Sequence, residues 1–244
     1  MDLFGFYADL PRIEPGGVTF SSAYLSAITI KSTDVVAELG SGLGSNATWI
    51  ARSRCCPVVA VDPDPRCLKE TMRRAEEGGG DVFVRPVRAD LASLPFQDQA
   101  FKVVVSEGAA LSLGLKHALT VWRRILAPGG ILALTYPGVV NKGAPTEVRG
   151  PLERRMAEPM GTLADYHAVV RGAGFELVHQ VSMQPELWES HYNDCVRHAW
   201  ALMRSERVSE EDPTIRRVLD EARWYRNVGR GRVFYVAMVL RRVQ

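Results

Sequence analysis

The stretch VVAELGSGLGSNATWIA, residues 35–51, begins as an apolar, β-branched run and then breaks into alternating glycines. The glycines are Gly40, Gly42 and Gly44, and an apolar, helix-like segment follows them. Glycine weakens regular structure by roughly 0.5–1 kcal/mol relative to alanine. Their clustering therefore indicates that something approaches the backbone closely, directly after a strand that the sequence predicts to be buried.

Strands and helices alternate along the first half of the chain, which predicts βαβ units and a parallel sheet covered by helices on both faces. This pattern is typical of a doubly wound α/β fold. The predicted strands are residues 34–39, 57–62, 82–90, 101–108 and 131–137, and the predicted helices are residues 45–52, 66–77 and 115–126.

The pattern changes after residue 137, where Gly, Pro and charged residues over 138–161 predict a loop or a short cap. We expect one domain over 1–244 that carries an N-terminal arm and a late helical insertion. Its parts are the arm and first helix (1–30, the helix at 19–30), the cofactor-binding core (34–137), a helix and strand (162–173 and 175–183), the cap (138–161 and 185–228, divided near 209–213) and the last strand (231–242).

Composition excludes several classes of protein. The 244 residues include 30 basic and 28 acidic side chains, a balance that does not support a nucleic-acid partner. The sequence has no secretory signal and no apolar run of the roughly 18 residues that a membrane span needs. Cys55, Cys56, Cys67 and Cys195 lack metal-ligand spacing, so we predict no metal site and a cytoplasmic location.

Open α/β sheets bind ligands beyond the carboxyl ends of their strands, which is where the glycine turn lies. The turn frees the N–H groups at the start of the next helix to bind an acceptor. Asp62 ends the second strand and is placed to accept hydrogen bonds from both hydroxyls of a ribose.

Two classes of cofactor fit these features, because residues 42–47 also satisfy the dinucleotide pattern G-x-G-x-x-A. Glu38 distinguishes the two classes, since its carboxylate precedes the turn and would repel a pyrophosphate. S-adenosylmethionine carries an ammonium and a sulfonium instead of phosphate. At an effective dielectric near 20, opposite charges about 4 Å apart attract by roughly 4 kcal/mol before desolvation. Glu38 therefore favours S-adenosylmethionine.

Further motifs carry a resemblance to a known family. Together with ELGSGLGS (38–45), the segments VRADLASLPFQDQAFKVVVSEGAAL (87–111) and LAPGGILAL (126–134) resemble class I S-adenosylmethionine-dependent methyltransferases. The resemblance covers residues 34–137 and points to the broad group that contains the quinone-biosynthesis enzymes. It implies a Rossmann-like, seven-stranded sheet whose last strand, 231–242, is antiparallel.

The same resemblance implies roles for individual residues. Asp62 and Pro63 would contact the ribose, Asp90 and Leu91 the adenine, and Glu107 would stand near the transferred methyl group. The methionine end would be lined by Glu38, Gly40, Ser41, Gly42 and Gly44.

A weaker resemblance extends to the arm PRIEPGGVTFSSAYLSAI (11–28), which is similar to the R-x-G-P-G-S arm of a bacterial and archaeal methyltransferase subgroup. Glu14 stands where that arm has its first glycine. We expect Arg12 and Gly16 to close over the cofactor. PELWESHYNDCV (185–196) is similar to the subgroup's W-x-x-Y-Y-x-P-L segment, with His191 in place of the first tyrosine.

A hydroxyl or ammonium acceptor requires a base, for which Glu107 and His191 are the candidates. Each has a structural alternative, because Glu107 could cap a helix that starts at Ala109 and His191 could simply pack. Tyr7, Tyr136 and Tyr192 are the candidate substrate-binding residues.

We therefore predict a methyltransferase that acts on a small molecule beneath the cap and yields S-adenosylhomocysteine. An RNA or protein methyltransferase, a non-catalytic S-adenosylmethionine-binding module and a dinucleotide oxidoreductase remain as alternatives. Both a monomer and a homodimer are compatible with the sequence.

Overall fold

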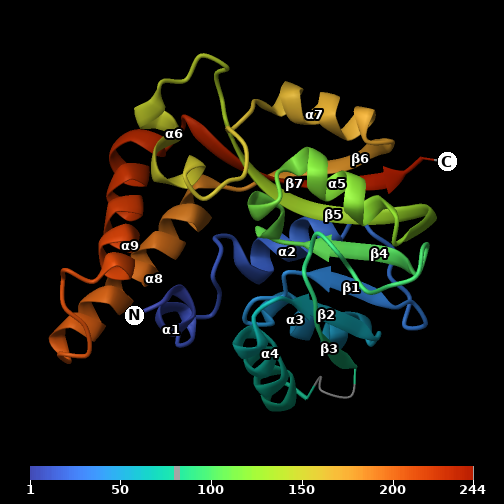
Figure 1. Ribbon diagram of the computed structural model, residues 1–244, viewed down its shortest axis with the longest axis horizontal. Helices are drawn as coiled ribbons and strands as arrows, with labels where there is room; N and C mark the ends of the chain where they lie inside the picture. The colour runs from blue at the N-terminus through green and yellow to red at the C-terminus, as the bar shows by residue number, and fades with distance from the viewer. Residues whose placement is uncertain (80–82, 244) are drawn as a thin grey trace.

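The computed structural model describes residues 1–79 and 83–243 and centres on a seven-stranded sheet (Figure 1). The strand order is β3-β2-β1-β4-β5-β7-β6, and β7 runs antiparallel to both of its neighbours. The predicted doubly wound sheet with an antiparallel last strand is thus confirmed. The strands are β1 (Val36–Leu39), β2 (Val58–Asp62), β3 (Val84–Arg88), β4 (Phe101–Ser106), β5 (Leu126–Val139), β6 (Phe175–Ser182) and β7 (Val233–Arg242).

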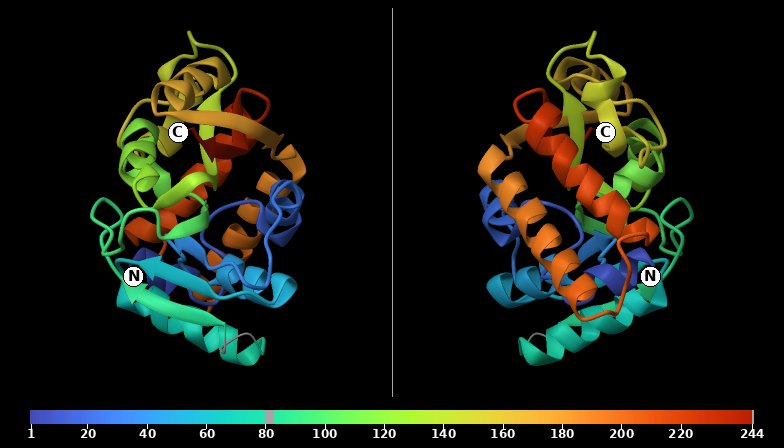
Figure 2. Two further views of the ribbon diagram at one scale, coloured as in Figure 1. Left: turned by 90° about the vertical axis from the view of Figure 1, so that its right-hand side faces the viewer. Right: turned by 90° about the vertical axis from the view of Figure 1, so that its left-hand side faces the viewer.

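Helices cover both faces of the sheet (Figure 2). On one face α2 packs on α3 and α3 on α4, and on the other face α5 packs on α7. Apolar residues of the central strands fill the space between these layers, as in β1, where Val36, Ala37 and Leu39 are fully buried. The helices are α2 (Gly17–Leu25), α3 (Ser45–Arg54), α4 (Pro65–Glu77), α5 (Leu115–Arg123) and α7 (Leu163–Gly172).

The remaining helices gather at the end of the sheet where the parallel strands finish (Figure 1). Of these, α8 (Pro185–Arg204) and α9 (Pro213–Trp224) pack on each other and, with the π-helical turn η2 (Tyr225–Gly229), are inserted between β6 and β7. α1 (Leu3–Tyr7) begins the arm, and α6 (Thr146–Glu153) lies in the segment expected to be a loop or short cap. A 3-10 turn, η1 (Ala109–Ser112), follows β4.

Several predicted boundaries were wrong. The helix expected over 115–126 ends at Arg123, because Leu126 already pairs with Phe101 in β5. The register then shifts at an irregularity in which β5 has extra residues between Leu126 and Ile131. Pairing resumes where Ile131 lies opposite Val103.

The first helix runs from Gly17 to Leu25 rather than from residue 19 to 30. The expected third strand, 82–90, is shorter, and its residue 82 lies outside the described residues. Over 1–79 and 83–243, no helix has the length and apolar character required to cross a membrane.

Candidate functional site

Three carboxylates lie side by side at the carboxyl edge of the sheet. Asp62 ends β2, Glu38 lies near the end of the neighbouring β1, and Glu107 follows β4 on the other side of β1. All three line one cavity of about 260 Å³. The structure brings the following predicted cofactor residues together around it: Arg12, Glu38, Gly40, Ser41, Gly42, Asp62, Pro63, Leu91 and Glu107.

The glycines of the turn make room chiefly for the protein itself. A Cβ on Gly40 would lie 2.3 Å from the Ala109 Cβ, and one on Gly44 would lie 2.6 Å from the Thr71 Cα. Both glycines also have positive φ values, 77° and 79°, which disfavour other residues. Gly44 therefore faces α4 instead of the cavity, whereas Gly40 and Gly42 line it.

Asp62 holds the glycine turn in place. Its two oxygens accept hydrogen bonds from the N–H groups of Gly42 and Asp64, both at 2.9 Å. Burial raises the pKa of Asp62, although these two hydrogen bonds oppose the shift. Each carboxylate oxygen keeps a second lone pair, so Asp62 can accept further hydrogen bonds from a ligand in the cavity.

Glu38 is the least satisfied acid at the site. Its side chain is 3% exposed, and its Oε2 has no hydrogen-bond partner. Burial raises the pKa of Glu38 well above its usual range, and the negative charge of Glu107 adds to this shift. The buried Oγ of the neighbouring Ser41 also lacks a partner. A buried polar atom without a partner is costly, so this corner of the cavity is suited to a ligand that donates hydrogen bonds.

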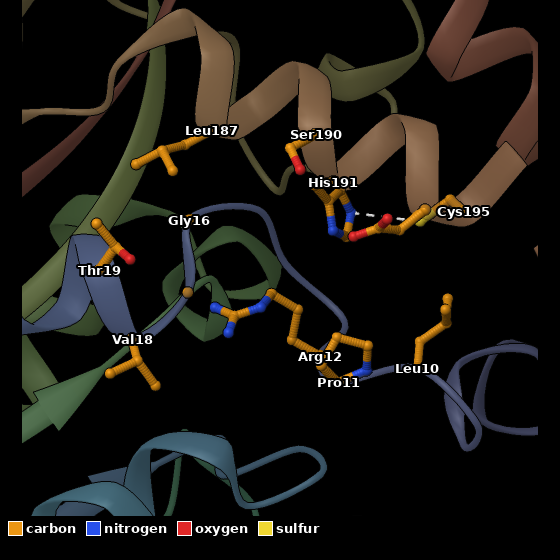
Figure 3. A pocket seen from close by; sticks show the side chains of 12 residues that line it. Leu10, Pro11, Arg12, Gly16, Val18, Thr19, Leu187, Ser190, His191 and Cys195 are labelled. Atoms are coloured by element: carbon orange, nitrogen blue, oxygen red, sulfur yellow. Dashed lines mark hydrogen bonds between the residues drawn. The ribbon is translucent and has the colours of Figure 1, made fainter. Parts of the chain in front are cut away.

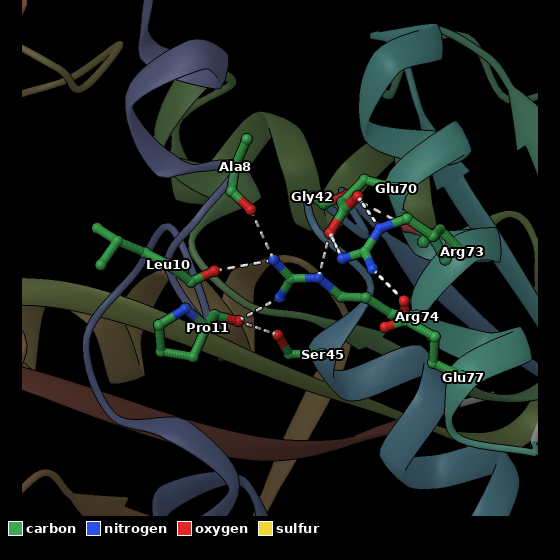
Figure 4. Close-up of polar contacts among 10 residues, drawn as sticks. Ala8, Leu10, Pro11, Gly42, Ser45, Glu70, Arg73, Arg74 and Glu77 are labelled. Carbon is green, nitrogen blue, oxygen red and sulfur yellow. Dashed lines mark hydrogen bonds and ion pairs between the residues drawn. The ribbon is translucent and has the colours of Figure 1, made fainter. Parts of the chain in front are cut away.

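Hydrogen bonds from α4 hold the N-terminal arm beside this cavity (Figure 4). The Arg74 guanidinium donates to the carbonyls of Ala8, Leu10 and Pro11 at 3.2, 2.8 and 2.7 Å. Glu70 accepts from Arg74 Nε at 2.6 Å and orients it. The arm is therefore a packed element that carries Arg12 to the edge of the cavity.

The arm also forms an ion pair with the cap. Glu14 accepts a hydrogen bond from Arg155 at 2.6 Å, and Arg155 lies 3.4 Å from Glu221 of α9. Glu14 lies so close to Gly108 that a Cβ on that glycine would come within 2.5 Å of its Cγ. The departure from the subgroup's arm motif at Glu14 thus supplies a charge that joins the arm to two cap segments.

A second cavity of about 310 Å³ lies between the arm and α8 and shares Arg12 with the first (Figure 3). Gly16 and His191 line this second cavity. Burial, together with the positive charges of Arg12 and Arg155, lowers the pKa of His191 to about 3. The neutral imidazole contacts the thiol of Cys195, with Nε2 and Sγ 3.6 Å apart.

The other predicted site residues are not among those that line either cavity, although the rings of Tyr7 and Tyr192 pack against His191. Asp90 is exposed, and its Oδ1 accepts a hydrogen bond from the N–H of Ala92. Tyr7, Tyr136 and Tyr192 are buried, and the Tyr136 hydroxyl donates to Glu158 at 2.9 Å. The roles predicted for these four residues stay predictions.

Comparison with known proteins adds a decisive match to this geometry. A family model described as a methyltransferase domain matches residues 37–134, which hold β1 to β4 and most of β5. The chain is a class I S-adenosylmethionine-dependent methyltransferase. The methyltransferase is 27% identical over 187 residues to YodH of Bacillus subtilis, an uncharacterized methyltransferase, covering 76% of this chain and 77% of that protein.

Two further comparisons show how far the likeness extends. A sarcosine/dimethylglycine N-methyltransferase of Halorhodospira halochloris is 27% identical over 164 residues, which are 67% of this methyltransferase but only 56% of that protein. An S-adenosylmethionine-dependent methyltransferase of Thiobacillus denitrificans, solved with S-adenosylhomocysteine, superposes with a TM-score of 0.83 at 18% identity, covering 96% and 95% of the two chains. This second likeness shows the shared fold.

The cavity of this methyltransferase fits S-adenosylmethionine on its own features. Glu38 Oε2 is a buried acceptor without a donor, which an ammonium or sulfonium would compensate. Asp62 has lone pairs free for hydroxyl donors, whereas the buried carboxyl group of Glu38 beside the glycine turn would repel a pyrophosphate. Glu38 thus gives no support to the binding of a dinucleotide in this cavity.

At a pH below the raised pKa of Glu38, we expect binding of the cofactor to release a proton from this side chain. A cation beside the carboxyl group favours its ionised form, so binding lowers this pKa and the affinity increases with pH. The slope approaches tenfold per pH unit between the lower pKa of the complex and the higher pKa of the free protein, at about 1.4 kcal/mol per tenfold, and vanishes outside this range. Calorimetry in buffers of different ionisation enthalpy measures the released proton. Glu38→Gln should abolish it, and an unchanged proton count in that variant would contradict the assignment to Glu38.

Proposed function

We propose that the protein transfers the methyl group of S-adenosylmethionine to a small-molecule acceptor held beneath the cap. The observation that carries the proposal is the position of the arm, which borders both cavities and is bound to Arg74 on one side and to Arg155 on the other. An arm and a cap over the reacting groups would limit the access of water and favour a small acceptor over a macromolecule. By this proposal residues 34–137 bind the cofactor, whereas 1–30, 138–161 and 185–228 form the cap.

S-adenosylmethionine would supply an electrophilic methyl group on a sulfonium and leave as S-adenosylhomocysteine. The chain's part is to hold the reactants in line, a contribution worth roughly 7–11 kcal/mol in well-oriented reactions. Asp62 would bind the ribose hydroxyls and Glu38 the cationic methionine end. Arg12 makes no ion pair with any described residue, so its guanidinium is available to an anionic group in either cavity.

Glu107 is the better candidate for a group that faces the acceptor or accepts its proton. It lines the cofactor cavity at the end of β4, where open α/β sheets place their reactive groups. His191, with its pKa lowered to about 3, is a weak base at neutral pH and lies in the second cavity. We therefore assign His191 to the wall of an acceptor pocket.

Fractionation of a methyl-labelled reaction tests the class of acceptor. Protein incubated with tritiated S-adenosylmethionine and a bacterial lysate should place the label in the small-molecule fraction. Label in RNA or protein would favour a macromolecular methyltransferase, and cofactor binding without any transfer would favour a binding module. Small secondary and tertiary amines are the first defined acceptors to try, since one relative is named for N-methylation of sarcosine and dimethylglycine.

Glu107→Gln tests the role of this carboxylate within the same reaction. We expect turnover to fall by about 100-fold, within the 100- to 10,000-fold range of acid–base catalysis, while affinity for S-adenosylhomocysteine changes little. The uncharged glutamine keeps the shape of the side chain, and Glu158→Gln, outside both cavities, is the matched control. Equal kcat in the Glu107 variant and the wild type would return Glu107 to a structural role.

A further inference from the structure

Two hydroxyl groups of α2 converge on one oxygen of Glu107. Ser21 Oγ donates to Glu107 Oε1 at 2.6 Å, and the Tyr24 hydroxyl donates to the same atom at 2.5 Å. Both side chains belong to the helix that follows the arm, more than eighty residues before Glu107 in the sequence. The resemblance of the arm to other methyltransferases assigned neither residue a role.

Both donors are suited to hold the carboxylate of Glu107. Tyr24 and Ser21 have no exposed surface, so water does not compete for their hydroxyl groups. Burial and the charge of Glu107 raise the pKa of Tyr24, which keeps its hydroxyl protonated and therefore a donor. The Ser21 hydroxyl also lies 3.1 Å from the Gly17 carbonyl, a longer contact than its 2.6 Å to Glu107.

These contacts leave one oxygen of Glu107 without a donor from α2. With Oε1 occupied by two donors, Oε2 is the oxygen left to interact with a ligand. Hydrogen bonds to one oxygen also restrict rotation of the carboxylate. The helix that carries both donors, α2, starts at Gly17. A Cβ on Gly17 would lie 2.6 Å from the Arg12 guanidinium, so the arm packs against the start of the helix that carries the two donors.

We propose that Ser21 and Tyr24 are positioning residues that aim the free oxygen of Glu107 at the reacting end of the cofactor, so that the site binds the sulfonium form in preference to the neutral thioether product. The inference rests on the proposed function. A carboxylate contributes to this preference only if it stays at a fixed place, because its Coulomb attraction declines with distance from the sulfonium. A side chain free to rotate into solvent would treat the two forms of the cofactor more nearly alike.

Calorimetry with S-adenosylmethionine and S-adenosylhomocysteine tests this, because the ratio of the two affinities responds to charge positioning and not to general damage. We expect Tyr24→Phe and Ser21→Ala, singly, to lower the affinity for S-adenosylmethionine by about fivefold and, together, by about tenfold or more. Each change is smaller than the roughly tenfold or greater loss of a direct hydrogen bond to a charged group, because these residues act on the ligand only through Glu107. Affinity for S-adenosylhomocysteine should change by less than about twofold. Ser22→Ala is the matched control, since Ser22 is next to Ser21 but donates to the Thr19 carbonyl on the exposed side.

A double-mutant cycle assigns the effect to Glu107. In a Glu107→Gln background, which has already lost the charge, Tyr24→Phe should leave the ratio of affinities unchanged. A wild-type protein that binds both compounds, with a ratio that neither Tyr24→Phe nor Ser21→Ala alters, would overturn the inference while the proposed function stands. A wild-type protein that binds neither compound would overturn the proposed function, and the inference with it.

Discussion

Replacing Asp62 with alanine is expected to weaken the binding of S-adenosylmethionine by about 100-fold or more. A hydrogen bond to a charged group is worth about 1.5–3 kcal/mol, and two ribose hydroxyls would lose theirs. The sum is about 3 kcal/mol or more, and each 1.4 kcal/mol is a tenfold change in affinity. Titration of the purified variant by calorimetry measures this loss, which should be the same for S-adenosylhomocysteine because both compounds carry the ribose.

The Asp62 experiment needs a control for the glycine turn, because the same carboxylate accepts hydrogen bonds from Gly42 and Asp64. Asp62→Asn keeps one acceptor oxygen and should retain part of the affinity. Asp64→Asn alters the neighbouring acid, which caps α4 by accepting from the Arg66 amide, and should bind as the wild type does. Equal affinity in Asp62→Ala and the wild type would remove the ribose assignment.

Replacing Arg155 with methionine is expected to lower the free energy of unfolding by about 3 kcal/mol, as for breaking other largely buried ion pairs. The change leaves Glu14 and Glu221 without their shared counter-charge, and their side chains are only 16% and 5% exposed. We take the lower end of the range because Arg155 itself is 21% exposed and Glu221 keeps its contact with Arg217 at 3.0 Å. In a chain of this size the Tm should fall by about 9 °C.

Urea denaturation of three variants isolates the ion pair. Arg154→Met alters the exposed neighbour of Arg155 and should stay within about 0.5 kcal/mol of the wild type. Combining Glu14→Gln with Arg155→Met should recover part of the loss, because one of the two uncompensated charges is removed. A loss in Arg155→Met no larger than that in Arg154→Met would show that the arm is not held by this charge.

The sheet could be predicted from the sequence because its signals are local. Each strand of the first half is an apolar run that ends at a turn, and the alternation with helices determines the layers. The boundary at Arg123 could not be predicted in this way. Residues 115–126 read as a helix that APGG (127–130) ends. Leu126 nevertheless belongs to β5, because it pairs with Phe101 of β4, whose N–H donates to the carbonyl of Ile125 at 2.9 Å.

The cavity followed from the same reasoning, since residues at strand ends meet at one edge wherever the sheet is parallel. That argument brings Glu38, Asp62 and Glu107 together. The same argument could not predict which side chains form hydrogen bonds or ion pairs with the acids of the site and the arm. Ser21 and Tyr24 contact Glu107 across 86 and 83 residues, and Arg155 contacts Glu14 across 141. Such contacts depend on how a helix and a cap pack, for which a single sequence carries no periodic signal.

The two-sided attachment of the arm has a consequence for the timing of catalysis. Arg12 and Glu14 form part of the wall of the proposed cofactor cavity, so exchange of spent for fresh cofactor on this side would require the arm to leave Arg74 or Arg155. In enzymes of this kind the slow step of a cycle is often the opening of such a segment rather than the chemistry. The steady-state rate of this enzyme would then measure how long the arm stays closed, and the first turnover would outpace all later ones.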